Sequence, residues 1–318
     1  MANFQYVTDI LNDALFRAHE PTDGTSDLNT QALVYLNRAH RSLCLGGAEL
    51  VPGMNEDWWW LRGESNLILE PALTTGTVTL TNNSNAVIFS SITTMSLYIG
   101  WYFQVDNHPD VFKITTGTTS DDGVLDSVYT GSTASAGTFK LMHLEYDLAA
   151  TARKLISPMN VNQGGRTQIY QTTLDRMQQM HPISQIQQGV PEHFAPVDEN
   201  TVRFSHYVSL TSGTYVRADY DYVMLATDLL ASTASITEPL VPLHYRQILA
   251  DWTLYFLMVD KDEANSEGIG LQAKAGIISM QKENRVRWVQ TGKQGQIEPR
   301  QRQVSRNLIR TRSGIIIG

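Results

Sequence analysis

Two pairs of acidic residues are the first places to look for chemistry in this chain. Asp219 and Asp221 lie two residues apart, so in a strand both carboxylates share one face. Like charges held there can raise one pKa or bind a cation, although a solvated strand face is the commoner outcome. Glu56 and Asp57 are adjacent and would point in different directions. Only Asp219 and Asp221 therefore have a spacing that suits an acid–base or cation site.

Other chemical motifs are missing from the sequence. Asp260, Asp262 and Glu263 lack the twelve-residue pattern of a calcium loop, and the eight histidines show no His-x-x-x-His spacing. A single cysteine, Cys44, excludes an internal disulfide and a cysteine-cluster metal site. There is no phosphate-binding loop, dinucleotide fingerprint or Gly-x-Ser-x-Gly motif. We therefore expect no catalytic, cofactor or metal site, and a protein that is not an enzyme.

Charge divides the chain unevenly. Residues 281–318 hold nine Lys or Arg and two Glu, a sum of +7, whereas the whole chain is −8, which leaves −15 for residues 1–280. Residues 291–318 show no helical period and close on three isoleucines. Such a segment cannot alone bury enough apolar surface to offset its conformational entropy. We interpret it as an extended docking arm that becomes ordered against a partner; a disordered, solvated end is the plainer alternative.

The arm carries the residue types that such docking needs. Arginines can pair with an acidic protein surface, and a β-forming apolar end can add a strand to an exposed sheet edge. Direct DNA binding is also possible, and we rank it lower. The candidate docking residues are Arg300, Arg302, Arg306, Arg310, Arg312, Ile315, Ile316 and Ile317.

Length and composition predict a globular protein of two domains, or of one domain with an insertion. The chain has 318 residues, of which 42 % are hydrophobic. Its first residues show no secretory signal, and no stretch approaches the roughly 18 apolar residues of a membrane span. We expect a protein made and folded in a reducing cytoplasm, with no membrane partner.

Apolar residues at helical spacing predict helices near both ends of the chain. They recur from Val7 to Ala18 and from Leu28 to Leu43, where Ser26 or Asp27 can cap the second helix and Gly46 with Gly47 can stop it. A short helix is expected over 174–180. Two longer ones are expected over about 245–259 and 263–289.

Short strands dominate the middle of the sequence. Between residues 72 and 145, runs rich in Thr, Val, Ile, Tyr and Phe alternate with turn residues. The predicted strands are 77–80, 86–89, 102–105, 111–115, 124–129 and 138–142. Further on, 201–205, 208–210 and 215–225 are predicted as antiparallel strands with a turn at 211–213.

These elements predict an α+β fold: a helical domain with an inserted small all-β barrel or sandwich and an extended basic C-terminal arm. The expected boundaries are 1–71 for the first part of the helical domain and 72–145 for the β module. Residues 146–290 are expected to form the second part of the helical domain, with an antiparallel hairpin. Residues 291–318 are expected to form the arm.

The aromatic run Trp58, Trp59 and Trp60 has two interpretations. Tryptophan is highly buried on average, so the run can close the core of the helical domain. Three adjacent indoles cannot all face one way, so at least one is expected to meet something other than its own core, and in the second interpretation this is a neighbouring subunit. All three are candidates for a subunit interface.

Several short segments are informative through their order along the chain. They are 33–39 (LVYLNRA), 57–62 (DWWWLR), 76–82 (GTVTLTN), 99–103 (IGWYF), 112–114 (FKI), 129–133 (YTGST), 138–141 (TFKL), 145–148 (EYDL), 153–155 (RKL) and 189–194 (GVPEHF). Their order resembles that of the head-to-tail adaptor, or connector, proteins of tailed bacteriophages, including the tail tubular protein A type. The likeness covers about residues 5–285. It departs at 148–150, where Leu-Ala-Ala replaces a Leu-Pro turn, and it does not extend to the arm.

This resemblance implies a ring, usually of twelve copies, in the neck of a virion between portal and tail. Its partners would be the portal protein, a tail or nozzle protein and further copies of the chain, with DNA passing through the channel without specific binding. The basic arm would then dock on the portal. A virion-associated protein that degrades cell wall or binds glycan, and a tail-side stopper or tube protein, remain as alternatives.

Overall fold

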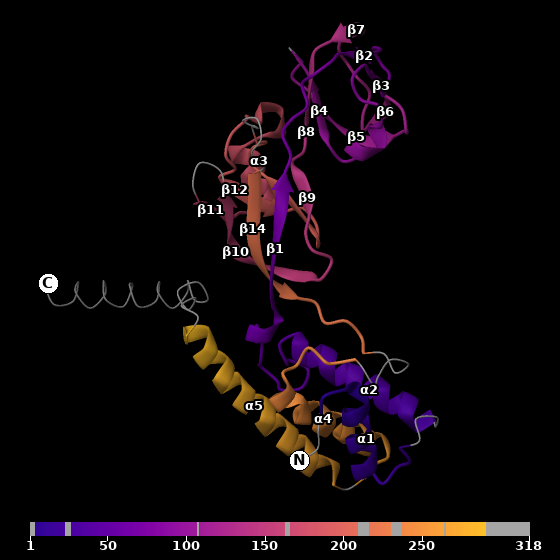
Figure 1. Ribbon diagram of the computed structural model, residues 1–318, viewed down its shortest axis with the longest axis vertical. Helices are drawn as coiled ribbons and strands as arrows, with labels where there is room; N and C mark the ends of the chain where they lie inside the picture. Colours follow the sequence, from indigo (N-terminus) through magenta and orange to yellow (C-terminus); the bar gives the residue numbers. More distant parts are fainter. Residues whose placement is uncertain are drawn as a thin grey trace, which may run out of the picture. The chain divides into compact units, whose positions relative to one another are not determined.

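The computed structural model describes residues 4–22, 27–106, 108–162, 166–208, 216–229, 237–263 and 265–290. They fall into two compact units (Figure 1). A helical unit lies within residues 1–62 and 225–318, and a β unit spans 63–224. In the described part of the chain, no helix is long and apolar enough to cross a membrane.

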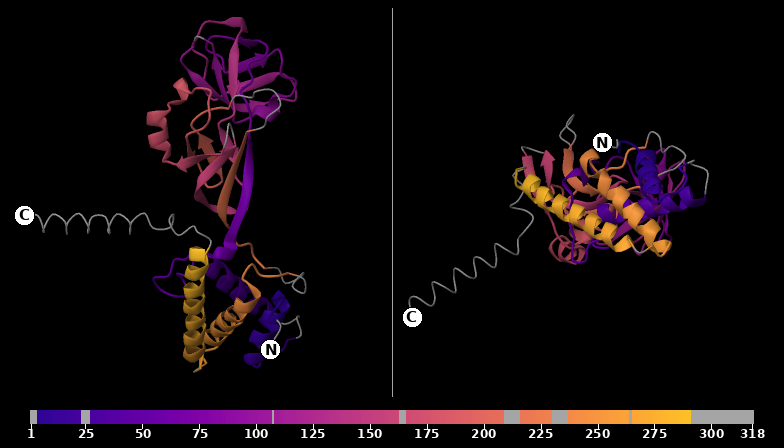
Figure 2. Two further views of the ribbon diagram at one scale, coloured as in Figure 1. Left: turned by 60° about the vertical axis from the view of Figure 1, so that its left-hand side comes forward. Right: turned by 90° about the horizontal axis from the view of Figure 1, so that it is seen from below.

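The helical unit is organised around one central helix. It contains α1 (Val7–Arg17), α2 (Asp27–Cys44), η1 (Trp59–Leu61), η4 (Leu243–Tyr245), α4 (Arg246–Asp260) and α5 (Ser266–Gln290). Helix α4 packs against α1, α2 and α5, and both pictures place α5 on one side of α4 with α1 and α2 on the other (Figures 1 and 2). Both ends of the sequence thus build this unit.

Local sequence signals set the ends of its helices. The backbone N–H of Tyr6 donates to Asp9 at 2.9 Å at the start of α1. After α2, Gly46 and Gly47 take positive φ angles of 106° and 78°, which favour glycine. The expectation that these glycines end the second helix is confirmed.

The first of two seven-stranded sheets in the β unit joins strands from distant parts of the sequence. Its order is β1-β14-β10-β11-β12-β13-β9. The strands are β1 (Arg62–Leu69), β9 (Glu145–Asp147), β10 (Ala152–Asn162), β11 (Arg166–Gln171), β12 (His193–Pro196), β13 (Thr201–Phe204) and β14 (Val216–Met224). On β14, residues 216, 218, 220 and 222 are buried and alternate with more exposed positions. This alternation directs one face of the strand into the sheet's core.

The second sheet has the order β7-β2-β3-β6-β5-β4-β8. Its strands are β2 (Val78–Leu80), β3 (Ala86–Phe89), β4 (Tyr102–Val105), β5 (Val111–Gly117), β6 (Asp122–Leu125), β7 (Ala134–Gly137) and β8 (Phe139–Met142), with η2 (Met95–Tyr98) between β3 and β4. Phe89, Phe103 and Phe139 meet in its core, where the ring centroids of Phe89 and Phe139 lie 4.9 Å apart. The two sheets share a smaller apolar cluster around Tyr102, Met142, Leu144 and Tyr207.

The predicted fold class is wrong in its main feature. The β part is not a small module inserted at 72–145; it runs from Gly63 to Met224 and holds two seven-stranded sheets in the described residues. Residues 146–224, assigned to the helical domain, supply five strands of the first sheet. That sheet depends on pairing between segments far apart in sequence, such as β10 with β14, which no local pattern announces.

The predicted strands 201–205 and 215–225 are present as β13 and β14, but these two strands do not pair with each other. Strand β13 pairs with β12 and β9, whereas β14 pairs with β10 and lies beside β1. The predicted strand 208–210 beyond Val208, the predicted turn at 211–213 and the arm at 291–318 lie outside the described residues.

Candidate functional site

Trp58 belongs to the core of the helical unit. Its side chain has no exposed surface, and its indole Nε1 donates to the carbonyl of Leu43 at 2.6 Å. The ring stacks on that of Trp60 with centroids 4.8 Å apart. Trp58 is therefore a core residue and not a subunit-interface residue.

Trp59 and Trp60 are half-buried within the same unit. The guanidinium of Arg287 lies 4.4 Å from the Trp59 ring centroid, and Trp60 packs against Tyr245. The backbone N–H of Trp59 donates to Asn284 of α5 at 2.9 Å. These contacts fix the segment on α5 and leave part of two indoles exposed, so a contact with another subunit stays a prediction for Trp59 and Trp60.

Helix α5 has apolar residues on two faces. Ala273, Ile277 and Met280 are fully buried against the unit's core. On the opposite side, Leu271 is 66 % exposed, Ile278 42 % and Val286 55 %. We call Leu271, Ala275, Ile278 and Val286 the α5 outer face. A helix with apolar residues on more than one face normally has more than one neighbour.

The far side of α4 also exposes large apolar side chains. Phe16 on α1 is 74 % exposed and Val34 on α2 is 59 % exposed. Beside Val34 lies a hollow of about 350 Å³, also lined by the ion pairs Arg38–Glu49 and Arg41–Asp228. We call Phe16, Val34 and this hollow the α1–α2 side.

Three of the acidic residues singled out in the sequence contact neighbouring side chains. Asp219 pairs with Arg217, whose Nε lies 2.7 Å from Asp219 Oδ1, on a partly exposed strand face. Glu56 binds α5 instead, because its carboxylate accepts from Gln281 and Asn284. Asp260 accepts from Gln31. The candidate arm residues, Arg300 to Ile317, lie outside the described residues.

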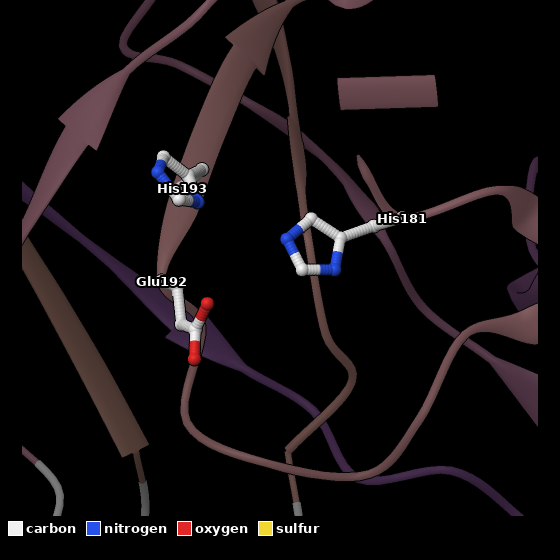
Figure 3. A group of neighbouring side chains, drawn as sticks. All are labelled: His181, Glu192 and His193. Atoms are coloured by element: carbon white, nitrogen blue, oxygen red, sulfur yellow. The ribbon is translucent and has the colours of Figure 1, made fainter. Parts of the chain in front are cut away.

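A cluster that sequence reasoning missed lies in the β unit. One potential metal-binding atom each from His181, Glu192 and His193 all lie within 4.8 Å of one another. Figure 3 shows the three side chains around a common space. His181 follows α3 (Leu174–Met180), and Glu192 with His193 opens β12. The parallel pairing of β11 and β12 demands a crossover between them, and that crossover brings His181 back beside β12.

Ser205 holds one side of this cluster in place. Its Oγ, almost fully buried, accepts from the backbone N–H of Glu192 at 3.0 Å and of His193 at 3.1 Å. Ser205 Oγ also lies 3.0 Å from His206 Nδ1. Burial, and then the nearby His181, lower the pKa of His206 below its ordinary value, so this imidazole favours its neutral form.

The sequence held only a faint signal for this cluster. Glu192 and His193 are adjacent, but His181 is eleven residues earlier, which matches no common ligand spacing. Only the crossover brings the three together.

No protein-family model and no curated protein sequence matches this chain.

Proposed function

We propose that this protein is a structural ring component of a tailed-phage neck, which joins the portal to the tail and lets DNA pass through its channel. The observation that carries the proposal is that large apolar side chains are exposed on opposite sides of α4, from α5 on one side and from Phe16 and Val34 on the other. The protein acts by shape and docking and not as an enzyme. It is located in the virion after synthesis in the host cytoplasm.

A closed ring needs two different surfaces that fit each other, one on each side of the subunit. The α5 outer face and the α1–α2 side offer two different surfaces within one unit. Side chains such as Leu271 and Ile278 would pack against the exposed Phe16 and Val34 of the next subunit. In the assembled ring, usually of twelve copies, both surfaces would be buried between subunits and shielded from solvent.

Charge agrees with the same proposal. The sum of −15 over residues 1–280 suits a lumen along which DNA must slide, because like charge weakens adhesion. The basic residues of 291–318 offer a separate docking segment for the acidic surface of a portal. The resemblance in segment order to head-to-tail adaptors adds to this support.

Fewer observations support the alternative functions. A retaining or inverting glycosidase needs two facing carboxyl groups, and Asp219 is instead paired with Arg217. A stopper or tube protein would also form a ring, but the basic segment favours the portal side.

The decisive measurement is negative-stain imaging of the full chain, alone and mixed with the portal of the same phage. We expect a monomer alone and rings with portal, because a ring formed early would compete with assembly on the portal. Rings formed without portal would support the ring itself but would contradict the claim that the portal templates its assembly. Absence of both rings and portal binding would contradict the proposal.

Leu271→Glu tests the interface itself. It places a charge on the α5 outer face and should weaken ring assembly at least tenfold, since burying a leucine contributes about 1.5–3 kcal/mol. Leu97→Glu is the matched control, because Leu97 is 71 % exposed in the β unit. Light scattering of portal mixtures measures both variants. Equal assembly by the two would exclude the α5 outer face as the contact.

A further inference from the structure

The crossover between β11 and β12 is weakly held by the sheet itself. The two strands pair over only two residue pairs, Tyr170 with His193 and Gln171 with Phe194. The connection contains α3 and the short turn η3 (Ile183–Gln185), and it returns to β12 at Glu192. A link between α3 and β12 would therefore reinforce the short pairing of β11 with β12.

The side chains at this point are suitable ligands. His193 Nδ1 is buried, and it has no hydrogen-bond partner among the described residues. A buried imidazole nitrogen without a partner costs free energy, and an ion bound at that nitrogen would recover it. Glu192 is exposed, so the cluster opens to solvent and an ion can enter.

Two imidazoles and one carboxylate select for a particular class of ion. Magnesium and calcium prefer oxygen ligands, whereas imidazole with carboxylate suits zinc and related divalent transition metals. Tetrahedral zinc with bonds of about 2.0–2.1 Å holds its ligand atoms about 3.4 Å apart. The three atoms here lie within 4.8 Å, so small side-chain rotations would close the site.

We propose that His181, Glu192 and His193 bind one zinc ion, which links the end of α3 to the start of β12. Water occupies the fourth position of the ion. Ser205 acts as a positioning residue, because its Oγ holds the backbone that carries Glu192 and His193. This proposal does not depend on the ring function, since all its residues lie in the β unit.

The test uses the full chain without a histidine tag, treated with chelator and then titrated with zinc chloride by calorimetry. We expect one zinc per chain with a dissociation constant in the micromolar range or below. At a hundredfold excess over that constant, the unfolding temperature should rise by about 5 °C. No zinc uptake at 100 µM would overturn the proposal.

Variants locate the ion. His181→Ala and His193→Ala should each weaken zinc binding at least 100-fold, and Glu192→Gln at least tenfold. His244→Ala, in the helical unit, is the matched control and should bind as the parent chain does. Unchanged binding by His181→Ala and His193→Ala would place the ion elsewhere and overturn the proposal.

Cobalt keeps the test decisive if a variant fails to fold. Co²⁺ added to the parent chain should give the visible absorption bands of a four-coordinate site, and one equivalent of Zn²⁺ should abolish them. Bands typical of six-coordinate cobalt, or no change from the free ion, would contradict the site.

Discussion

His40 is a buried histidine without a hydrogen-bond partner for Nε2 among the described residues. It lies on α2 and is 1 % exposed. Burial lowers its pKa from an ordinary 6.5 to about 4, and the carboxylate of Asp228 opposes this shift weakly. The folded protein therefore keeps His40 neutral at a pH where an unfolded chain would protonate it.

This difference predicts a loss of stability in mild acid. Below about pH 6.5 the unfolded chain takes up a proton that the folded chain refuses, so stability falls as the pH drops toward about 4. Between pH 7.5 and pH 5 this group alone should cost about 2 kcal/mol of the free energy of unfolding. Urea unfolding of the parent chain and of His40→Gln at both pH values measures the effect.

Carboxylates also titrate in acid, so the result is the difference between the two chains. His40→Gln should lose about 2 kcal/mol less than the parent over this range. His19→Asn is the control, since His19 is exposed and has a positive φ that Asn tolerates. The stability of His19→Asn should change with pH as that of the parent chain does. An identical pH response of His40→Gln and the parent would contradict the burial of a neutral His40.

Between α4 and α5, two glycines allow a close approach of the helices. A Cβ at Gly276 would lie 2.9 Å from Ile248 Cγ1, and one at Gly270 would lie 2.8 Å from a ring carbon of Tyr255. Gly268, in the first turn of α5, has no atom within 4 Å of that position. The chain thus offers a crowded and an open glycine on one helix.

Gly276→Val should destabilise the helical unit by about 1–3 kcal/mol more than Gly268→Val, because the added methyls overpack the α4–α5 contact. In a helix interior valine has a higher helix propensity than glycine, which favours the variant at position 276, so a greater loss of stability there reports packing. Thermal and urea unfolding measure it. Equal effects of both substitutions would mean that Ile248 moves aside without cost.

Local patterns located most individual elements. The apolar spacing predicted the helices now seen as α1, α2, α3, α4 and α5, with ends within a few residues. The predicted strands at 86–89 and 102–105 match β3 and β4. Among the described residues, six strands were not predicted: β1, β7, β9, β10, β11 and β12. Strand β1 follows the Trp-rich run assigned to the helical domain, and β7 (ASAG) has small residues with no apolar alternation.

At the scale of the whole molecule, the basic segment gives the sharpest prediction. A chain that ends at Gln290 should unfold at the same temperature as the full chain, because the buried residues described in both units precede it. It should no longer bind portal, because it lacks the arginines and the isoleucine end. Calorimetry and co-sedimentation with portal measure the two effects.

Two further chains separate charge from strand addition. One replaces the five arginines by serine and keeps Ile315, Ile316 and Ile317; the other replaces only the isoleucines. We expect both to bind portal more weakly than the full chain, and only the chain that retains its arginines to remain sensitive to salt. Full portal binding by the truncated chain would contradict the docking role of residues 291–318. It would not affect the proposal that the protein forms a ring.

The sequence by itself determined the helices, many strands, the glycine stop after α2 and the charge difference between the body and the last residues. These depend on neighbours within a few positions, so periodicity and composition reveal them. Only the tertiary structure decided that residues 63–224 form one β unit, that Trp58 is core, and that His181 meets Glu192 and His193. Each of these rests on contacts between segments far apart in the chain. Such contacts form when the free energy gained by burial exceeds the entropy lost in closing the loop between the segments, and neither quantity can be read from a local sequence pattern.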